Sequence, residues 1–599
     1  MSASNLPRRT FVGASLTTAT GAGLAMSGVG RAAAGLIPST GRRVAVIGAG
    51  PGGLTAAHEL AERGFSVTVY ERKALGGKAR SIPVSGTAAG GRADLPGEHG
   101  FRFFPGFYQN VTETMSRIPF GDQPNGVRDN LVAAEVTSMA WKGREFSIPV
   151  GPSGVTEMTP EAFGRFFTAA VGTSVEVPPQ DLALFTSKAA TFFASGPKRR
   201  MQQWENTSWS DFMRMDTLSP AGRALLVDFP TSALVAAKAD VANTRTIGLM
   251  MEALFLSAAR QGGYTDPDQL LNAPTNESWI DPWVLHLRGL GVQFNVGWTV
   301  TGLSCPQGRI KAASALDPTG APRTIEADWF VLAVPVERAI PLLNAKILAI
   351  DPRLQRLRNL TTDWMNGVMI YTKEATPIVK GHVAYIGEPW ALTSINQASF
   401  WGRDFASTYG DGSVRDCLSV DVSNWDAPGI LYGKPAKECT RQEIVDEVIA
   451  QIRHALPDGD ARLPDSNIHS WFVDPAITGE GTPSVANDEP LLVNTVSSWW
   501  DRPAATTKVP NLFLAADYVR SSVNLATMEG ANEAGKAAAN GVLDASGSLA
   551  SRAVIRKLHE PLPSKVLWAE DDLAFDLGLP NAFDVVAPDR PAGTGLLPL

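Results

Sequence analysis

A glycine-rich stretch near residue 50 has the composition of a phosphate-binding turn. It contains Gly48, Gly50, Gly52 and Gly53, with Pro51 among them. The unbroken apolar run Val44 to Ile47 precedes it and predicts a buried parallel strand. Glycines let the chain turn tightly and bring backbone N–H groups against a pyrophosphate, and the positive N-terminus of a following helix favours the same anion. The chemistry that this turn favours is therefore dinucleotide binding.

An acidic residue lies where the ribose of a dinucleotide would need it. Small and apolar residues after the glycines predict a helix over about residues 52–63. A second strand, 66–70, then leads to Glu71 and Arg72. Glu71 follows the glycines by about twenty residues, the spacing at which a carboxylate accepts the hydroxyl groups of an adenosine ribose. Together these elements predict a nucleotide-binding βαβ unit, whereas the glycines alone would also fit a plain structural turn.

A second glycine pair, with two cations, follows this unit. Gly76 and Gly77 precede Lys78 and Arg80, and the Arg80 guanidinium can hydrogen-bond a pyrophosphate from its second side. The alternative is a solvated surface arginine. The arrangement resembles the flavoprotein fold shared by amine oxidases and phytoene desaturases, and that resemblance favours FAD over NAD.

Four longer blocks resemble the plant and cyanobacterial type of phytoene and zeta-carotene desaturase. They are residues 97–110, 271–286, 381–395 and 510–535. The resemblance implies that Asp517 holds the ribityl chain, and that a helix opening near Met528 and Glu529 points its N-terminus at the flavin pyrimidine. It also implies a cofactor contact at Val300. We expect the FAD to be non-covalent, because no cysteine or histidine lies in a family-like attachment context near the C-terminal block.

The block 97–110, which the resemblance places beside the isoalloxazine ring, contains the two catalytic candidates. His99 is interpreted as a general base, a flavin neighbour or a histidine satisfied beside Glu98. Phe101 and Arg102 stand where the family has a more apolar pair, so Arg102 would place a cation near the ring or the pocket mouth. Ala516 replaces a glycine that usually precedes the aspartate. Neither departure removes a flavin contact, but Arg102 allows a more polar or acidic substrate.

For several other conspicuous side chains, a structural role is an alternative to a functional one or is the expected role. Trp499 and Trp500 would line a tunnel for a long apolar ligand or belong to ordinary core packing. His286, His382 and His469 are scattered without the spacing of metal ligands, so we expect no metal site. No GxSxG turn and no carboxylate pair indicates hydrolytic chemistry. The reactive group is expected to be the flavin, which the protein positions and shields from water.

Composition narrows the classes of partner. Of the 599 residues, 44% are apolar and 19% are charged, which is ordinary for a globular enzyme. The formal net charge of −7 offers no basic field for nucleic acid, and we expect none as a partner. The three cysteines, Cys305, Cys417 and Cys439, are widely spaced and are expected to be buried small hydrophobes.

The first forty residues resemble a twin-arginine export signal. Arg8 and Arg9 precede a weakly apolar, glycine-rich segment, and three alanines at 32–34 offer small residues for cleavage. A Sec signal or an unstructured arm is the alternative. The signal predicts export to the periplasm or cell envelope, with peripheral membrane contact left open. No segment has the length and apolarity of a membrane span.

The expected fold class is α/β, with a Rossmann-like FAD-binding domain built from discontinuous segments and an inserted α+β substrate domain. The expected segments are an export signal or arm (1–40), the FAD-binding domain (41–110, 286–345 and 501–545), the substrate domain (111–285 and 346–500) and a C-terminal tail of little periodicity (546–599). The predicted activity is hydride transfer to or from an apolar isoprenoid or polyene, as in carotenoid desaturases and hydroxysqualene dehydroxylase. The alternatives are a flavin amine oxidase, a flavin-dependent double-bond isomerase and a non-catalytic lipid-binding flavoprotein. The sequence predicts neither the electron acceptor nor the oligomeric state.

Overall fold

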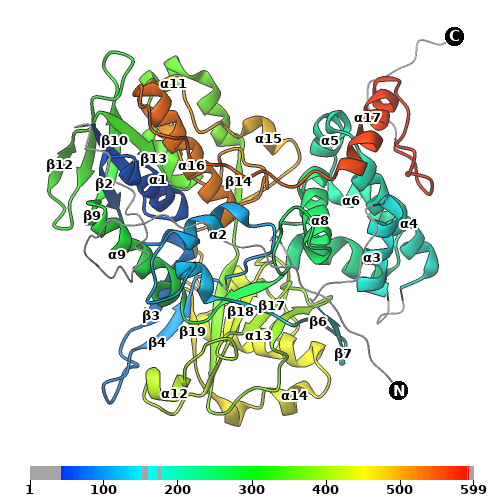
Figure 1. The fold of residues 1–599 in the computed structure, drawn as a ribbon. Coiled ribbons are helices and arrows are strands. Elements are labelled where there is room, and N and C mark those ends of the chain that lie inside the picture. Colours follow the sequence, from blue (N-terminus) through cyan, green and yellow to red (C-terminus); the bar gives the residue numbers. More distant parts are fainter. Residues whose placement is uncertain are drawn as a thin grey trace, which may run out of the picture.

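The computed structural model describes residues 42–100, 102–149, 159–172, 177–233, 235, 237–589 and 591. Within them the chain forms three lobes (Figure 1): a parallel sheet with helices α1 and α16, a second sheet at the bottom of the view, and a helical lobe at the right. The proposed export signal and Phe101 lie outside the described residues.

The first lobe is built on a five-stranded parallel sheet with the strand order β23-β13-β1-β2-β9. Its strands are β1 (Arg43–Ile47), β2 (Ser66–Glu71), β9 (Gln293–Val296), β13 (Trp329–Leu332) and β23 (Leu512–Leu514). Segments far apart in sequence thus share one sheet, as predicted, and the α/β fold class is confirmed. Strands β13 and β23 are fully buried, whereas β9, at one edge of the sheet, is partly exposed.

Helices α1 (Pro51–Glu62) and α16 (Met528–Ala545) pack against this sheet and against each other. The packing is close because the contact residues are glycines: a Cβ on Gly52 would lie 2.0 Å from the carbonyl oxygen of Ala515, and one on Gly535 would lie 2.5 Å from that of Gly52. Thr527 caps α16 by accepting a hydrogen bond from the N–H of Gly530. Both helices therefore begin at the carboxyl edge of the sheet.

The second lobe is a seven-stranded mixed sheet with the order β19-β15-β18-β17-β16-β6-β7. Its strands are β6 (Val136–Trp141), β7 (Arg144–Pro149), β15 (Asn366–Thr372), β16 (Gly381–Tyr385), β17 (Thr393–Asn396), β18 (Asp416–Val422) and β19 (Ile468–Val473). Helix α13 (Arg441–Ala455), which a capping box between Thr440 and Glu443 starts, buries its apolar face in one cluster with this sheet.

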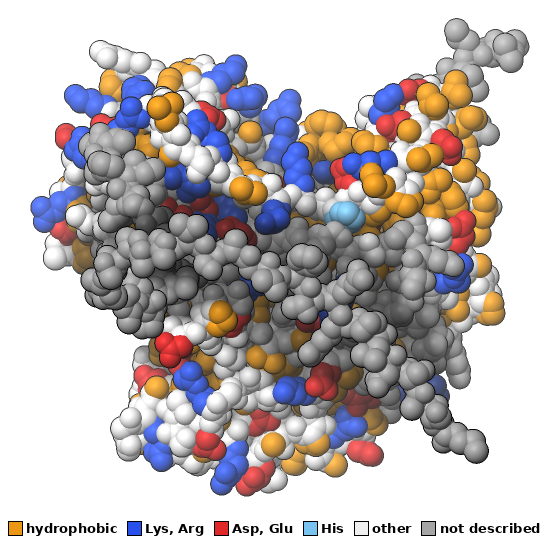
Figure 2. All heavy atoms as spheres, in the orientation of Figure 1, with side chains coloured by type: hydrophobic (Ala, Val, Ile, Leu, Met, Phe, Trp, Pro, Cys, Tyr) orange, Lys and Arg blue, Asp and Glu red, His pale blue; other side chains and the backbone are white. Residues whose placement is uncertain are grey.

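The third lobe is helical. It contains α3 (Pro160–Gly172), α4 (Pro179–Ala194), α5 (Pro197–Gln202), α6 (Trp209–Phe212), α7 (Pro220–Gly222), the π-helix η5 (Arg223–Ala233), α8 (Thr244–Ala258) and α17 (Leu562–Asp576). Helix α17 contacts α4 and α5. The tail expected at residues 546–599 thus contains a helix that packs on this lobe. Leu562, Val566 and Leu573 of α17 remain exposed, as does Leu577 directly after it, and apolar side chains gather on this lobe in Figure 2.

Shorter elements connect the lobes. The helices are α2 (Gln109–Ser116), α9 (Asp281–Gly289), α10 (Val336–Ala339), α11 (Ala345–Ile350), α12 (Phe405–Thr408), α14 (Gly459–Arg462) and α15 (Ser498–Asp501). The strands are β3 (Ser81–Val84) with β4 (Leu95–Glu98), β5 (Leu131–Ala133) with β8 (Gln269–Leu271), β10 (Thr299–Ser304) with β11 (Ala312–Leu316) and β12 (Pro322–Ile325), β14 (Thr361–Asp363) with β22 (Leu491–Val493), and β20 (Ile477–Thr478) with β21 (Ala486–Asn487). The three cysteines are buried. Among the described helices, none combines the length and apolarity needed to cross a membrane.

Candidate functional site

The two glycine turns predicted to bind phosphate are in contact with each other. Gly48 has a φ of +104°, and a Cβ there would lie 2.5 Å from the carbonyl oxygen of Ala333. A Cβ on Gly77 would lie 2.9 Å from Cα of Gly50, which is the residue before α1. The turn after β1 and the turn before η1 (Gly77–Ala79) therefore form one cradle of backbone that side chains would fill.

The carboxylate of Glu71 lies at the end of β2, beside this cradle. Its Oε2 accepts a hydrogen bond from the N–H of Ala49, and its Oε1 accepts one from the N–H of Lys73, both at 2.8 Å. Each carboxylate oxygen can accept more than one hydrogen bond. Glu71 thus fixes the glycine turn and keeps acceptor capacity for ribose hydroxyl groups.

The three predicted cations near the cradle all meet acidic or carbonyl oxygens. Arg80 is 7% exposed and forms a two-pronged ion pair with Glu489, so the alternative of a solvated surface arginine is wrong. Arg72 contacts Asp488 at 2.9 Å. Lys78 donates to the carbonyl of Pro490. These partners from the segment 488–490 carry no signal in the sequence, because they lie about four hundred residues from the cradle and in no motif.

The predicted C-terminal residues lie near the same edge of the sheet. Asp517 is half-buried three residues after β23, and the buried Arg502 donates to the carbonyls of residues 517–519. Met528 is half-buried at the start of α16, and Val300 is half-buried in β10. Arg502 also donates to Oδ1 of Asn524 at 2.8 Å, and it carried no signal in the sequence because it lies in no recognisable motif.

The side chain of Glu529 contacts the start of another helix. Its carboxylate accepts hydrogen bonds of 2.8 Å from the backbone N–H groups of Asn110 and Val111, in the first turn of α2. Burial raises the pKa of Glu529 to about 7, although these hydrogen bonds act in the opposite direction. The side chain therefore binds the positive end of α2, and α16 is tied to the block 97–110.

His99 pairs with Asp474 and not with its neighbour Glu98. Its Nδ1 lies 2.5 Å from Oδ2 of Asp474, whose side chain is fully buried. Although burial opposes it, the charge of His99 and the hydrogen bonds to Asp474 lower the pKa of that carboxyl group. The expected pairing beside Glu98 is wrong, because the carboxylate of Glu98 instead accepts hydrogen bonds from the hydroxyl and N–H of Thr275.

Arg102 lies inside the protein near Glu98. Its guanidinium donates to the carbonyls of Lys78 and Ala79, and its Nε is 3.9 Å from Oε2 of Glu98. Both side chains line a cavity of about 10 Å³, roughly the space of one water molecule. Burial raises the pKa of Glu98 to about 7. Arg102 therefore ties the block 97–110 to the cradle through the carbonyl of Lys78.

These features fit an elongated dinucleotide cofactor. The backbone cradle, the carboxylate of Glu71 and the start of α16 all lie at the carboxyl ends of parallel strands, where open α/β sheets bind such ligands. A side chain at Gly48 or Gly77 would collide with the facing backbone, and bare backbone is what a close approach to phosphate requires.

A larger cavity, of about 550 Å³, lies between η5 and the turn that joins β16 to β17. Apolar residues dominate its lining, among them Met215, Ala224, Phe229, Ile386 and Pro389. The strands beside this cavity lead to the block 97–110. In β16, β17 and β18, Ala384 pairs with Thr393, and Thr393 pairs with Asp421. The carboxylate of Asp421 lies against Gly100, where a Cβ would be only 2.9 Å from it. A small-molecule site of this size is large enough for a ligand of many carbon atoms.

Two unusual backbone features border this cavity. The wall formed by η5 is a π-helix that contains Pro230, and π-helical turns are frequent at functional sites. Ala391, in the opposite wall, has a φ of +49°, a conformation that costs a non-glycine residue about 1 kcal/mol. Such strain persists where the surrounding structure imposes it, as at binding sites.

Trp499 and Trp500 line neither of the two cavities described. Trp499 is half-buried between two guanidinium groups, 4.3 Å from that of Arg245 and 5.1 Å from that of Arg520, and Trp500 is 40% exposed. The tunnel interpretation therefore fails for the described cavities, and core packing does not describe these two side chains either.

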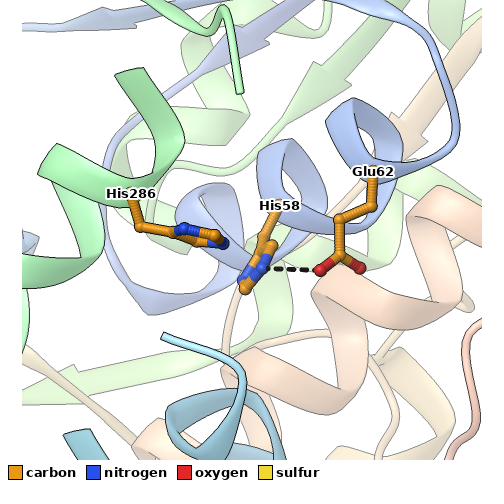
Figure 3. A group of neighbouring side chains, drawn as sticks. All are labelled: His58, Glu62 and His286. Carbon is orange, nitrogen blue, oxygen red and sulfur yellow. Dashed lines mark hydrogen bonds and ion pairs between the residues drawn. The ribbon is translucent and has the colours of Figure 1, made fainter. Parts of the chain in front are cut away.

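His286, which the sequence analysis left isolated, meets His58 and Glu62 of α1 (Figure 3). The three ligand-type atoms lie within 4.8 Å of one another. However, the indole N–H of Trp283 donates to Nδ1 of His58 at 3.1 Å, so Nε2 carries the proton and contacts Glu62 at 3.1 Å. A metal ion at Nε2 would displace that proton. Burial lowers the pKa of His286 to about 4. The hydrogen bond between Trp283 of α9 and His58 of α1 therefore links these two helices.

Comparison with known proteins gives consistent results. The family described as flavin-containing amine oxidoreductase matches residues 51–543. The chain is 23% identical over 525 residues to the carotenoid phi-ring synthase of Streptomyces griseus, covering 84% of this chain and 88% of that protein. It is 52% identical over 48 residues, 8% of this chain and 9% of the other, to protoporphyrinogen oxidase 2 of Arabidopsis thaliana. Among solved structures, a putrescine oxidase bound to putrescine superimposes with a TM-score of 0.54 at 15% identity, covering 84% and 99% of the two chains. An oxidoreductase from Methanosarcina mazei superimposes with a TM-score of 0.52 at 15% identity, covering 84% and 100%.

Proposed function

Because the chain belongs to the family of flavin-containing amine oxidoreductases, we propose that it binds FAD non-covalently and acts by hydride transfer on an apolar isoprenoid or polyene. It is a flavin-dependent oxidoreductase with an α/β fold. When bound, the flavin supplies the hydride acceptor, and the protein supplies binding, orientation and exclusion of water.

The cavity beside η5 is the observation that supports this substrate class. Its volume of about 550 Å³ and its mainly apolar lining suit a bulky hydrocarbon better than a short polar molecule. It adjoins the strand ends that meet the block 97–110, the segment expected beside the flavin ring. The similarity over most of the chain to a carotenoid phi-ring synthase supports the same class.

An amine substrate is the second candidate, and one feature favours it. Asp228, Asp240 and Glu388 line the same cavity. Glu388 contacts His454 at 2.7 Å, and the lysine of the cavity, Lys238, contacts Asp426 at 2.5 Å, which leaves Asp228 and Asp240. An excess of carboxylates favours a cation. A double-bond isomerase would use the same site, so its distinction from a desaturase depends on the redox outcome.

Two further proposals concern location. We propose export through the twin-arginine pathway, because a flavoprotein that binds its cofactor in the cytoplasm is best exported folded, and because Arg8 and Arg9 precede a weakly apolar segment. The exposed apolar side chains of α17 make peripheral membrane contact a compatible proposal.

A substitution that fills the cavity tests the proposed function. Replacing Ala224, which lines the cavity, by Phe should raise KM for a polyene at least tenfold while flavin content stays unchanged. The matched control is Ala569→Phe on the exposed side of α17, which should change neither quantity. Turnover of a diamine with no reaction of any polyene would favour the amine oxidase instead.

A further inference from the structure

Two consecutive carboxylates in the loop between β21 and β22 meet cations from three separate segments of the chain. Asp488 lies 2.9 Å from Arg72 and 2.5 Å from Lys73, and it also pairs with Arg338. Glu489 pairs with Arg80. All four cations belong to segments around the phosphate cradle, whereas the carboxylates come from the stretch expected to be substrate domain.

The pair of Arg80 and Glu489 is the buried one. Nη1 and Nη2 of Arg80 donate to the two carboxylate oxygens at 2.9 and 2.8 Å, and the side chains are 9% and 10% exposed. Burial by itself would lower the pKa of Arg80, but the hydrogen bonds and charge of Glu489 raise it. A buried two-pronged pair of this kind fixes the plane of the guanidinium as well as its position.

The same guanidinium is anchored to the cradle. Nη1 of Arg80 also donates to the carbonyl of Gly77 at 2.6 Å, and Gly77 is the residue that meets Gly50. In the described part of the chain, these bonds use three of the five N–H groups of Arg80. The Nε–H and one Nη2–H remain to donate to phosphate oxygens beside the glycine turns.

We propose that Glu489 is a positioning residue that holds Arg80 in the orientation needed to bind the pyrophosphate of FAD. The inference deepens the proposed function and rests on it only for the identity of the cofactor. Glu489 partly cancels the charge of Arg80, which opposes anion binding. Holding the guanidinium in place outweighs this loss of charge, because an unrestrained arginine must lose the freedom of several rotatable bonds to make the same contacts with phosphate.

The rate of FAD release from the purified holoenzyme tests this inference. Free FAD is followed by its fluorescence after dilution, without turnover. Glu489→Gln should release FAD about tenfold faster than the wild type, as loss of hydrogen bonds to a charged group predicts. Glu489→Asp keeps the charge but is too short for both bonds, so it should also release FAD faster. Asp488→Asn, the neighbouring and more exposed acid, should stay within about twofold.

A double-variant comparison separates positioning from general loosening. In the background of Arg80→Ala, adding Glu489→Gln should change the release rate by less than about twofold, because the residue to be positioned is gone. Thermal unfolding of each holoenzyme checks that folding is intact. Release from Glu489→Gln that is as slow as, or slower than, wild type would overturn the inference. If the FAD release rates follow these expectations but no polyene reacts, only the proposed function is overturned.

Discussion

The backbone N–H of Ala49 donates a 2.8 Å hydrogen bond to Oε2 of Glu71. One carboxylate thus joins the glycine turn after β1 to the end of β2, and its other oxygen binds the N–H of Lys73. The residue predicted to bind the cofactor ribose is therefore also part of the scaffold that shapes the phosphate cradle.

Replacing Glu71 by Ala should weaken FAD binding by about 1.5–3 kcal/mol, the usual loss for a hydrogen bond to a charged group. Titration of the apoprotein with FAD measures the change, and Glu71→Gln, which keeps an acceptor oxygen for Ala49, should lose less. An unchanged Kd for the alanine variant would mean that the ribose contact lies elsewhere.

Glu98 should make stability fall as the pH rises. Burial raises the pKa of its carboxyl group from 4.5 to about 7, so between these values the folded protein holds a proton that the unfolded chain releases. Glu98→Gln removes this dependence. Its free energy of unfolding relative to wild type should therefore increase from pH 4 to pH 8, by up to about 3 kcal/mol. Denaturant unfolding at both pH values checks this, and a difference that is independent of pH would contradict the buried carboxyl group.

The segment after α17 should be held by a buried lysine. Lys188 is fully buried between Asp584, at 2.9 Å, and Asp589, at 2.7 Å. Lys188→Met leaves the buried Asp584 without its cation, although Asp589 keeps its pair with Arg214, and should cost about 3–5 kcal/mol of unfolding free energy. Lys198→Met is the matched control, because the Lys198–Asp576 pair is largely exposed and should contribute less than about 1 kcal/mol. Equal losses would show that the buried pair is not what holds the segment.

Changing Arg8 and Arg9 together to Lys should leave folding and FAD binding unchanged while the protein stays in the cytoplasm. The reason is that the export pathway recognises the arginine side chains and not merely their charge. Cell fractionation of a tagged chain measures the outcome. Normal export of the double variant would indicate a different signal.

The elements of the cofactor half could be predicted because their signals are local. The run Val44–Ile47, the glycines and Glu71 lie within thirty or so residues, and each has a direct physical meaning. The partners of Arg80, His99 and Lys188 could not be predicted, because Glu489, Asp474 and Asp584 are hundreds of residues away and lie in no motif. Helix α17 was missed for another reason: prolines flank it, and its apolar stripe faces solvent, so the composition resembled a loop.

The state of the flavin after one turnover without oxygen tests the central claim most directly. Mixing oxidised holoenzyme with one equivalent of a polyene or isoprenoid substrate should bleach the flavin absorbance, and the product should be about two mass units lighter, since one H₂ is lost. Conversion to a product of unchanged mass, and only after the flavin has been reduced beforehand, would contradict hydride removal and establish the isomerase instead.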